Sequence, residues 1–167
     1  MRCSVVADAG AGADMSPIVE SPLFLADEAA TLAFAQRFAA DVQPPCSVAL
    51  VGDLGAGKTT FVRGVLRALG VTGAIKSPTY AVMEPYELEG GMVWHFDFYR
   101  FNDAQEWEDA GFRDVFASRG LKLAEWPEKA EGLLPCPDLR IAIEPLANEA
   151  RRVTLAAYTP RGLEILA

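Results

Sequence analysis

A glycine-rich run that ends in lysine and threonine is the feature of the chain that could do the most specific chemistry. Residues 52–59 read Gly-Asp-Leu-Gly-Ala-Gly-Lys-Thr and match the pattern G-x-x-x-x-G-K-[ST] at every position. In such a run the glycines let successive backbone N–H groups point at one spot, which forms a nest for an anion. Lys58 can reach the outer phosphates of a nucleotide, and the Thr59 hydroxyl can bind the Mg²⁺ that bridges them. The run therefore predicts a phosphate-binding loop.

The residues on either side of this run have the character that a phosphate loop requires. Ser47 to Val51 is a short apolar run typical of a buried strand, and residues 58–69 are predicted to form a helix. A helix that begins at Lys58 aims the positive end of its dipole at the bound phosphate. A glycine-rich turn that carries Lys and Thr by chance is the alternative, and the agreement of pattern and context disfavours it.

Asp97 is the first candidate for the carboxylate that a phosphate loop needs to hold Mg²⁺ or to orient water. It lies in a predicted strand over residues 92–98. Because alternate side chains of a strand share a face, His95, Asp97 and Tyr99 point one way and the aromatic residues between them point the other. This polar face favours a site. Asp97 as a turn cap and His95 as an ordinary strand residue remain alternatives.

Glu125 is the second candidate carboxylate. It follows the apolar run 121–124, so it is expected at the carboxyl end of a central strand. In open α/β sheets, ligands bind in the crevice outside these strand ends. The alternative is a solvated glutamate in a loop.

The run Ser77-Pro78-Thr79-Tyr80 lies between the predicted phosphate-loop helix and a predicted hairpin. Nucleotide-switched proteins often place a mobile segment at this point of the chain. The Thr79 hydroxyl is a candidate sensor of a γ-phosphate or its metal. On composition alone the run is equally typical of a plain turn.

The order of the predicted elements indicates an α/β fold of the P-loop NTPase type, a mixed sheet with a parallel centre flanked by helices. Strands and helices alternate early in the chain, and strands dominate late. Residues 22–167 are predicted as one domain, after a leader at residues 1–21 that is predicted to be disordered. The predicted helices are a segment from the capping Asp27 to about Val42, then 58–69, and 103–110 with Asp103 as its cap. The predicted strands are 47–51, 79–88, 92–98, 121–124, 139–143, 153–158 and a last one at 162–166.

Length and charge limit the classes of protein to which the chain can belong. Its 167 residues suffice for one compact domain with a sizeable core. No stretch approaches the roughly 20 apolar residues of a membrane helix, and the first residues lack the apolar run of a secretory signal. We therefore expect a cytoplasmic protein without membrane contact. The net charge of −8 argues against direct gripping of nucleic-acid phosphates, so such contact is expected only through a partner.

Four motifs, taken together and in this order, resemble those of the TsaE (YjeE) family. Members of this family are the ATPase subunit of the bacterial tRNA threonylcarbamoyladenosine machinery. The four motifs are residues 52–60, 76–80, 95–100 and 125–128. The resemblance runs from about Leu25 to the C-terminus. It implies a P-loop α/β fold and a slow ATPase that acts with the transferase subunits TsaD and TsaB. These subunits modify adenosine 37 of tRNAs that read codons beginning with A, and the chain would contact tRNA only indirectly.

The resemblance also implies a set of site residues. The ATP phosphates would be bound by Asp53, Leu54, Gly55, Ala56, Gly57, Lys58, Thr59 and Thr60. Thr59 and Glu125 would hold Mg²⁺, Asp97 and Lys58 would be catalytic, and Glu28 would lie near the adenine. The sequence departs from the family at Phe98, where leucine is common, and we expect this difference to affect packing only.

Two other classes of phosphate-loop protein are alternatives. A small-molecule kinase needs an arginine-rich lid, and none stands out, although Arg100, Arg113 and Arg119 keep this alternative open. A GTPase switch carries an [NT]-K-x-D base reader and a D-x-x-G motif, and neither occurs in the sequence. A screen for phosphate transfer to metabolites tests the first alternative, and a comparison of ATP and GTP affinity tests the second.

Overall fold

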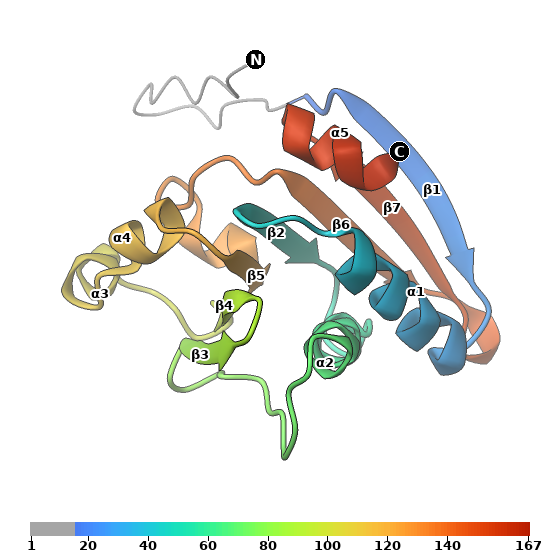
Figure 1. The fold of residues 1–167 in the computed structure, drawn as a ribbon, viewed down its shortest axis with the longest axis horizontal. Helices are drawn as coiled ribbons and strands as arrows, with labels where there is room; N and C mark the ends of the chain where they lie inside the picture. The colour runs from blue at the N-terminus through green and yellow to red at the C-terminus, as the bar shows by residue number, and fades with distance from the viewer. Residues whose placement is uncertain (1–15) are drawn as a thin grey trace.

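A computed structural model describes residues 16–167, which form a single mixed sheet with helices packed on it (Figure 1). The sheet has seven strands in the order β1-β7-β6-β2-β5-β4-β3. The strands are β1 (Val19–Leu25), β2 (Cys46–Val51), β3 (Met83–Leu88), β4 (Gly91–Asp97), β5 (Leu121–Glu125), β6 (Leu139–Pro145) and β7 (Arg151–Ala157). The central strands β6, β2, β5 and β4 run parallel, and the outer pairs are antiparallel. The predicted sheet with a parallel centre is confirmed.

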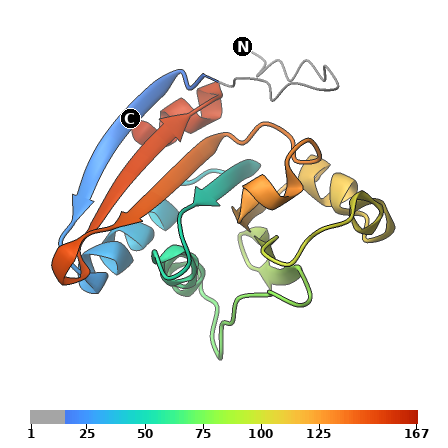
Figure 2. The same ribbon diagram turned by 180° about the vertical axis from the view of Figure 1, so that it is seen from behind.

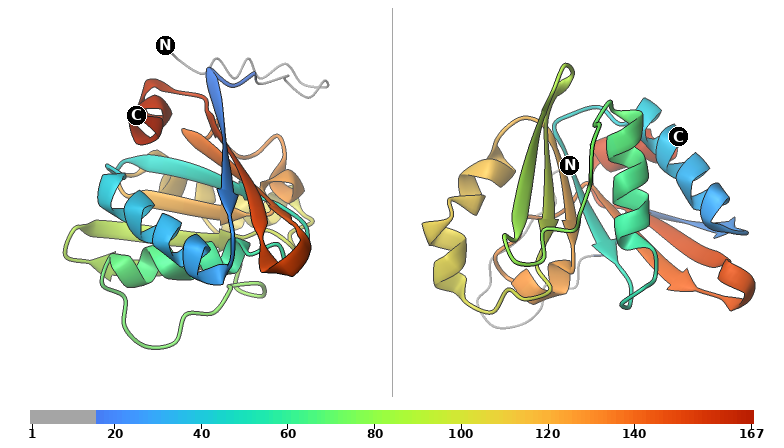
Figure 3. Two further views of the ribbon diagram at one scale, coloured as in Figure 1. Left: turned by 90° about the vertical axis from the view of Figure 1, so that its right-hand side faces the viewer. Right: turned by 90° about the horizontal axis from the view of Figure 1, so that it is seen from below.

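The helices divide between the two faces of the sheet, as Figure 3 shows from the side and from below. One face carries α1 (Glu28–Asp41), α2 (Lys58–Ala68) and α5 (Pro160–Leu166), and the other carries α3 (Ala104–Asp109) and α4 (Phe112–Ala117). Short 3₁₀ turns follow β5 and β6, at Pro127–Ala130 (η1) and Ala147–Glu149 (η2). None of the helices within residues 16–167 is long and apolar enough to cross a membrane. Seen from behind in Figure 2, β1, β7 and β6 present a face that no described helix covers.

Two hydrophobic cores result from this division. The larger one lies between the sheet and helices α1 and α2, where Phe34 and Phe38 of α1 pack on the ring of Phe61 in α2. Gly64 lets these two helices approach closely, because a Cβ there would lie 2.8 Å from the Cβ of Ala35. The second core is mostly aromatic and lies under α3 and α4; its buried members are Val82, Phe96, Phe98, Phe101, Trp107, Phe112, Ala124 and Ala130. Together the cores fix β2, β4 and β5, whose carboxyl ends meet at one edge.

Two of the predicted boundaries and the type of one predicted element are wrong. Strand β1 begins at Val19 and pairs with β7, so the predicted leader at 1–21 overlaps the sheet. The strand predicted from Thr79 begins only at Met83, because residues 79–82 form a turn in which Val82 has a positive φ. The last predicted strand is helix α5. The rest of the predicted leader, residues 1–15, lies outside the described residues.

The helix at the C-terminus has an ordinary start signal. Thr159 caps α5 by accepting a hydrogen bond from the backbone N–H of Gly162, and Pro160 occupies the first helical position. The predicted Asp27 cap of α1 and Asp103 cap of α3 are confirmed in the same way, since each side chain accepts a backbone N–H of the first turn.

Candidate functional site

The phosphate loop joins the carboxyl end of β2 to helix α2. Gly52 is required there because a Cβ would lie 2.5 Å from the carbonyl oxygen of Ile143 in β6. Gly57 has a φ of 109° and precedes α2 without giving it a side-chain cap. The backbone N–H groups at the start of α2 are therefore left for a ligand, and the helix dipole favours an anion.

The side chain of Lys58 folds back onto the phosphate loop and binds its backbone. Its Nζ donates to the carbonyl oxygen of Gly52 and, at 3.2 Å, to that of Asp53. The same ammonium lies 3.8 Å from the centroid of the Trp126 ring, which is cation–π geometry. Burial lowers the pKa of Lys58, and nearby Glu125 is the largest of the charges that oppose this shift. Lys58 is thus held against the loop by two backbone carbonyl oxygens and an aromatic ring.

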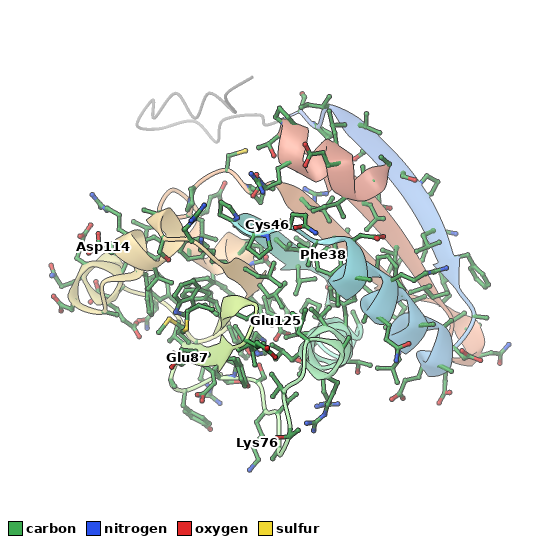
Figure 4. All side chains as sticks on the ribbon, viewed as in Figure 1. Phe38, Cys46, Lys76, Glu87, Asp114 and Glu125 are labelled. Carbon is green, nitrogen blue, oxygen red and sulfur yellow. The ribbon has the colours of Figure 1, made fainter. Side chains whose placement is uncertain are left out.

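Glu125 is a buried carboxylate at the end of β5, with an exposed fraction of 2%. Its Oε1 accepts a hydrogen bond of 2.8 Å from the hydroxyl of Thr59 in the first turn of α2. Its Oε2 lies 2.5 Å from Nε2 of His95. Figure 4 shows Glu125 between β4 and α2. The structure therefore joins the two residues that the sequence analysis assigned to Mg²⁺.

Asp97 ends β4 next to Glu125, with which it pairs in the sheet register. Its Oδ1 accepts the backbone N–H of Tyr99 at 2.9 Å. Its Oδ2 accepts the hydroxyls of Ser77 and, at 3.2 Å, of Thr79. The Ser77–Tyr80 run, read from sequence as a switch segment or a turn, thus reaches the site through Asp97. The predicted separation of faces on β4 is confirmed, because Phe96 and Phe98 lie in the aromatic core on the other side.

A cavity of about 390 Å³ opens above these groups. Its lining residues are Leu54, Gly55, Gly57, Lys58, Thr59, Thr60, Ser77, Thr79, Asp97, Tyr99, Glu125, Trp126 and Arg151. Eight of the residues predicted at the site are therefore brought together here. Asp53 is tied to the site through the Lys58 contact, and Ala56 is buried inside the loop.

Glu28 lines a smaller neighbouring cavity of about 80 Å³ with Thr31 and Glu149. Gly57, Thr60 and Arg151 line both cavities, so the two adjoin. The structure places Glu28 beside the phosphate loop and away from Asp97 and Glu125. Its predicted position near the adenine remains a prediction.

Arg151 is the residue at the site that sequence reasoning missed. It begins β7, and its Nε donates to the carbonyl oxygen of Ala56 at 2.7 Å. The sequence shows it only as one of a basic pair with Arg152. No local pattern connects it with a loop that lies 95 residues earlier.

A divalent cation at this site would need ligands besides protein carboxylates. Within residues 16–167 no group of three or more His, Cys, Asp or Glu is arranged to hold a metal ion. The Thr59 hydroxyl and the Glu125 carboxylate are hard oxygen donors in direct contact, which suits Mg²⁺. Mg²⁺ keeps several waters and commonly takes its other ligands from substrate phosphates. The donor set therefore fits Mg²⁺ bound together with a nucleotide.

The loop, the strand order and the paired carboxylates define a P-loop α/β protein. The model of the family "Threonylcarbamoyl adenosine biosynthesis protein TsaE" matches residues 25–153. A Haemophilus influenzae protein named tRNA threonylcarbamoyladenosine biosynthesis protein TsaE is 40% identical over 148 residues, 86% of this chain and 93% of its own. A Bacillus subtilis protein of the same name is 38% identical over 131 residues, 78% of this chain and 82% of its own.

A solved structure agrees with these sequence relatives. The crystal structure of Bacillus subtilis YdiB superposes with a TM-score of 0.71 at 29% identity, covering 89% of this chain and 92% of that one. The chain belongs to the TsaE family. The resemblance drawn from four short motifs is confirmed.

Proposed function

We propose that the chain is a Mg²⁺-dependent ATPase required for threonylcarbamoyl modification of adenosine 37 in tRNAs that read codons beginning with A. It acts in the cytoplasm with the transferase subunits TsaD and TsaB. The observation that carries this proposal is the contact of Thr59 with Glu125 directly behind a complete phosphate loop. The names of the relatives supply the pathway.

The phosphates of ATP bind to residues 53–60 in this proposal. The backbone N–H groups of the loop and of the first turn of α2 surround the β-phosphate. Lys58 leaves the carbonyl oxygens of Gly52 and Asp53 and turns its ammonium to the outer phosphates. Arg151, which lies beside Gly57, is near enough to the loop to add a second positive charge.

Thr59 and Glu125 hold Mg²⁺ in this proposal. Held there, Mg²⁺ would supply positive charge against the charge that develops on the outer phosphates. Asp97 orients the attacking water. Its Oδ2 already accepts the hydroxyls of Ser77 and Thr79, whereas Oδ1 accepts only the backbone N–H of Tyr99. Oδ1 therefore keeps an acceptor site for the water.

Hydrolysis by the isolated chain should be slow. In the described part of the chain, Arg151 is the one arginine that lines the cavity, and its guanidinium is engaged with the carbonyl oxygens of Ala56 and Ala150. An arginine supplied by a partner can raise phosphoryl-transfer rates by roughly 10³- to 10⁵-fold. The net charge of −8 likewise favours binding to protein partners, with tRNA contacted only through them.

Reconstitution tests this function. Purified TsaD and TsaB are supplied with the threonylcarbamoyl donor, tRNA and ATP, with and without the chain, and the modified nucleoside is measured by mass spectrometry. The proposal expects sustained modification only when both the chain and ATP are present. Modification at the same level without the chain would contradict it. Transfer of phosphate from ATP to a metabolite would instead establish the small-molecule kinase.

A further inference from the structure

His95 is the buried side chain that holds the inner oxygen of Glu125. Its exposed fraction is 0%, and its Nε2 lies 2.5 Å from Glu125 Oε2. The other oxygen of this carboxylate, Oε1, accepts the hydroxyl of Thr59. Glu125 is therefore fixed at both oxygens, by β4 on one side and by the phosphate-loop helix on the other.

The register of the sheet explains this contact. Strands β4 and β5 are parallel, with Asp97 paired to Glu125 and His95 paired to Leu123. Since alternate residues share a face, His95 lies on the same face as Asp97, one step back along β4. Its ring is long enough to span that step to the carboxylate on the neighbouring strand.

The two ring nitrogens of His95 have different surroundings. Nδ1 is buried and has no hydrogen-bond partner among the described residues. Nε2 faces a carboxylate, and an ionised carboxylate only accepts hydrogen bonds. Nε2 must therefore carry the hydrogen, which makes His95 a donor to Oε2.

We propose that His95 is a positioning residue for the metal site: by donating to Oε2 it keeps Glu125 in the rotamer that leaves Oε1 beside Thr59. The proposal rests on the function proposed above for this site. Without the donor, Oε2 would be a buried, weakly satisfied oxygen, whose remaining contact is with Ser77 Oγ at 3.5 Å. The carboxylate would then turn towards other donors and lose its alignment with Thr59.

Three substitutions separate positioning from packing. In His95→Gln the amide nitrogen reaches about as far as Nε2, so the donor to Glu125 is kept. His95→Asn is the matched control, because its amide nitrogen reaches only to the position of Nδ1. His95→Phe keeps a planar ring but has no donor.

The measurement is the Mg²⁺ dependence of equilibrium binding, followed with a fluorescent ATP analogue, together with Mn²⁺ binding followed by electron paramagnetic resonance. Loss of an outer-shell partner typically costs about 10- to 100-fold in metal affinity. We expect His95→Asn and His95→Phe to raise the half-saturating metal concentration by at least about fivefold, and His95→Gln to stay below that shift. A smaller shift in His95→Asn, or an equal shift in all three folded variants, would overturn the role of His95.

A second test uses the unsubstituted protein, so its result does not depend on whether a variant folds. His95 is the single histidine of the chain, so its ring ¹⁵N signals need no assignment. A long-range ¹H–¹⁵N spectrum is expected to show a hydrogen on Nε2. A spectrum that shows the hydrogen on Nδ1 alone would rule out donation to Glu125 and contradict the proposal.

The outcomes also separate this inference from the proposed function. If the unsubstituted protein binds ATP with no dependence on Mg²⁺, the proposed metal site itself is wrong. If that dependence is present and His95→Asn leaves it unchanged, only the positioning role of His95 is wrong.

Discussion

Thr59 and Glu125 are joined by a hydrogen bond of 2.8 Å from the threonine hydroxyl to Oε1 of the glutamate. This contact links the first turn of α2 to the end of β5, two elements separated by 66 residues in the chain. It forms because β2 and β5 are parallel neighbours, with Leu50 paired to Glu125. The phosphate loop and its carboxylate therefore meet at the same edge of the sheet, where open α/β sheets bind ligands.

Lys58→Ala should weaken ATP binding by about 10- to 100-fold, since hydrogen bonds to a charged group contribute about 1.5–3 kcal/mol. The check is ATP titration by calorimetry, with circular dichroism to confirm the fold. Lys76→Ala is the matched control, because Lys76 is exposed at a loop tip away from Glu125 (Figure 4). ATP affinity unchanged in a folded Lys58→Ala protein would remove Lys58 from the site.

Glu125→Gln and Asp97→Asn should both slow ATP hydrolysis, but in different ways. Glu125→Gln replaces a proposed metal ligand by a neutral amide, so nucleotide retention and its Mg²⁺ dependence should fall together. Asp97→Asn should lower kcat more than affinity, because Asp97 is assigned to water and to the Ser77–Tyr80 run. Steady-state kinetics over a range of Mg²⁺ concentrations separates the two effects. If either variant turns over ATP as fast as the unsubstituted protein, the substituted residue has no part in hydrolysis.

Gly64→Ala should destabilise the fold although alanine is the better helix former. The added Cβ would lie 2.8 Å from Ala35 Cβ and 3.1 Å from Leu32 Cδ2, both on α1. Overpacking of this kind costs about 1–3 kcal/mol, against a gain of about 1 kcal/mol in helix propensity. We expect a net loss of about 1 kcal/mol, seen as a fall in Tm of about 2–4 °C. Gly90→Ala, with open space around it, is the control, and an equal fall there would refute the close packing.

Cys46 should be inert towards thiol reagents in the folded protein. It is 1% exposed, and burial raises the pKa of its thiol from 9.0 to about 12, so little reactive thiolate forms near pH 8. Reagent uptake is compared between the unsubstituted protein and Cys46→Ala, first folded and then in denaturant. The two should take up equal amounts when folded and differ by one thiol when unfolded. A difference in the folded state would show that Cys46 is accessible.

The same shift has a consequence for stability. Because the folded-state pKa of Cys46 lies above its ordinary value, the folded form binds more protons between pH 9.0 and about 12. The contribution of this thiol to the free energy of unfolding is therefore constant below pH 9 and falls as the pH rises towards 12. The Cys46→Ala protein should lack that fall.

The phosphate loop and its two carboxylates could be predicted because their signals are local. Eight consecutive residues define the loop, and Asp97 and Glu125 each follow a recognisable apolar strand. The His95 contact could not be predicted, since it depends on the register between β4 and β5. The contact of Arg151 with the loop could not be predicted either, because only the pairing of β6 with β7 brings its guanidinium there.

Two of the errors in the fold, at β1 and α5, lie near the ends of the described chain. β1 pairs along its full length with β7, yet Pro22 and Ser21 in its sequence are not typical of a strand. α5 has a helix start signal in Thr159 and Pro160, but its short apolar run is equally typical of a strand. α4 was missed because its six residues are too few to show a helical period.

The most direct test of the account is the rate of ATP hydrolysis, measured for the chain alone, with TsaD and TsaB, and with tRNA only. The loop and both carboxylates lie within residues 16–167, but the one arginine of this range that lines the cavity, Arg151, is engaged with backbone carbonyl oxygens. We therefore expect slow turnover alone, no response to tRNA, and stimulation by the transferase subunits of roughly 10³-fold or more. Full activity in isolation, or stimulation by tRNA without the protein partners, would contradict the account.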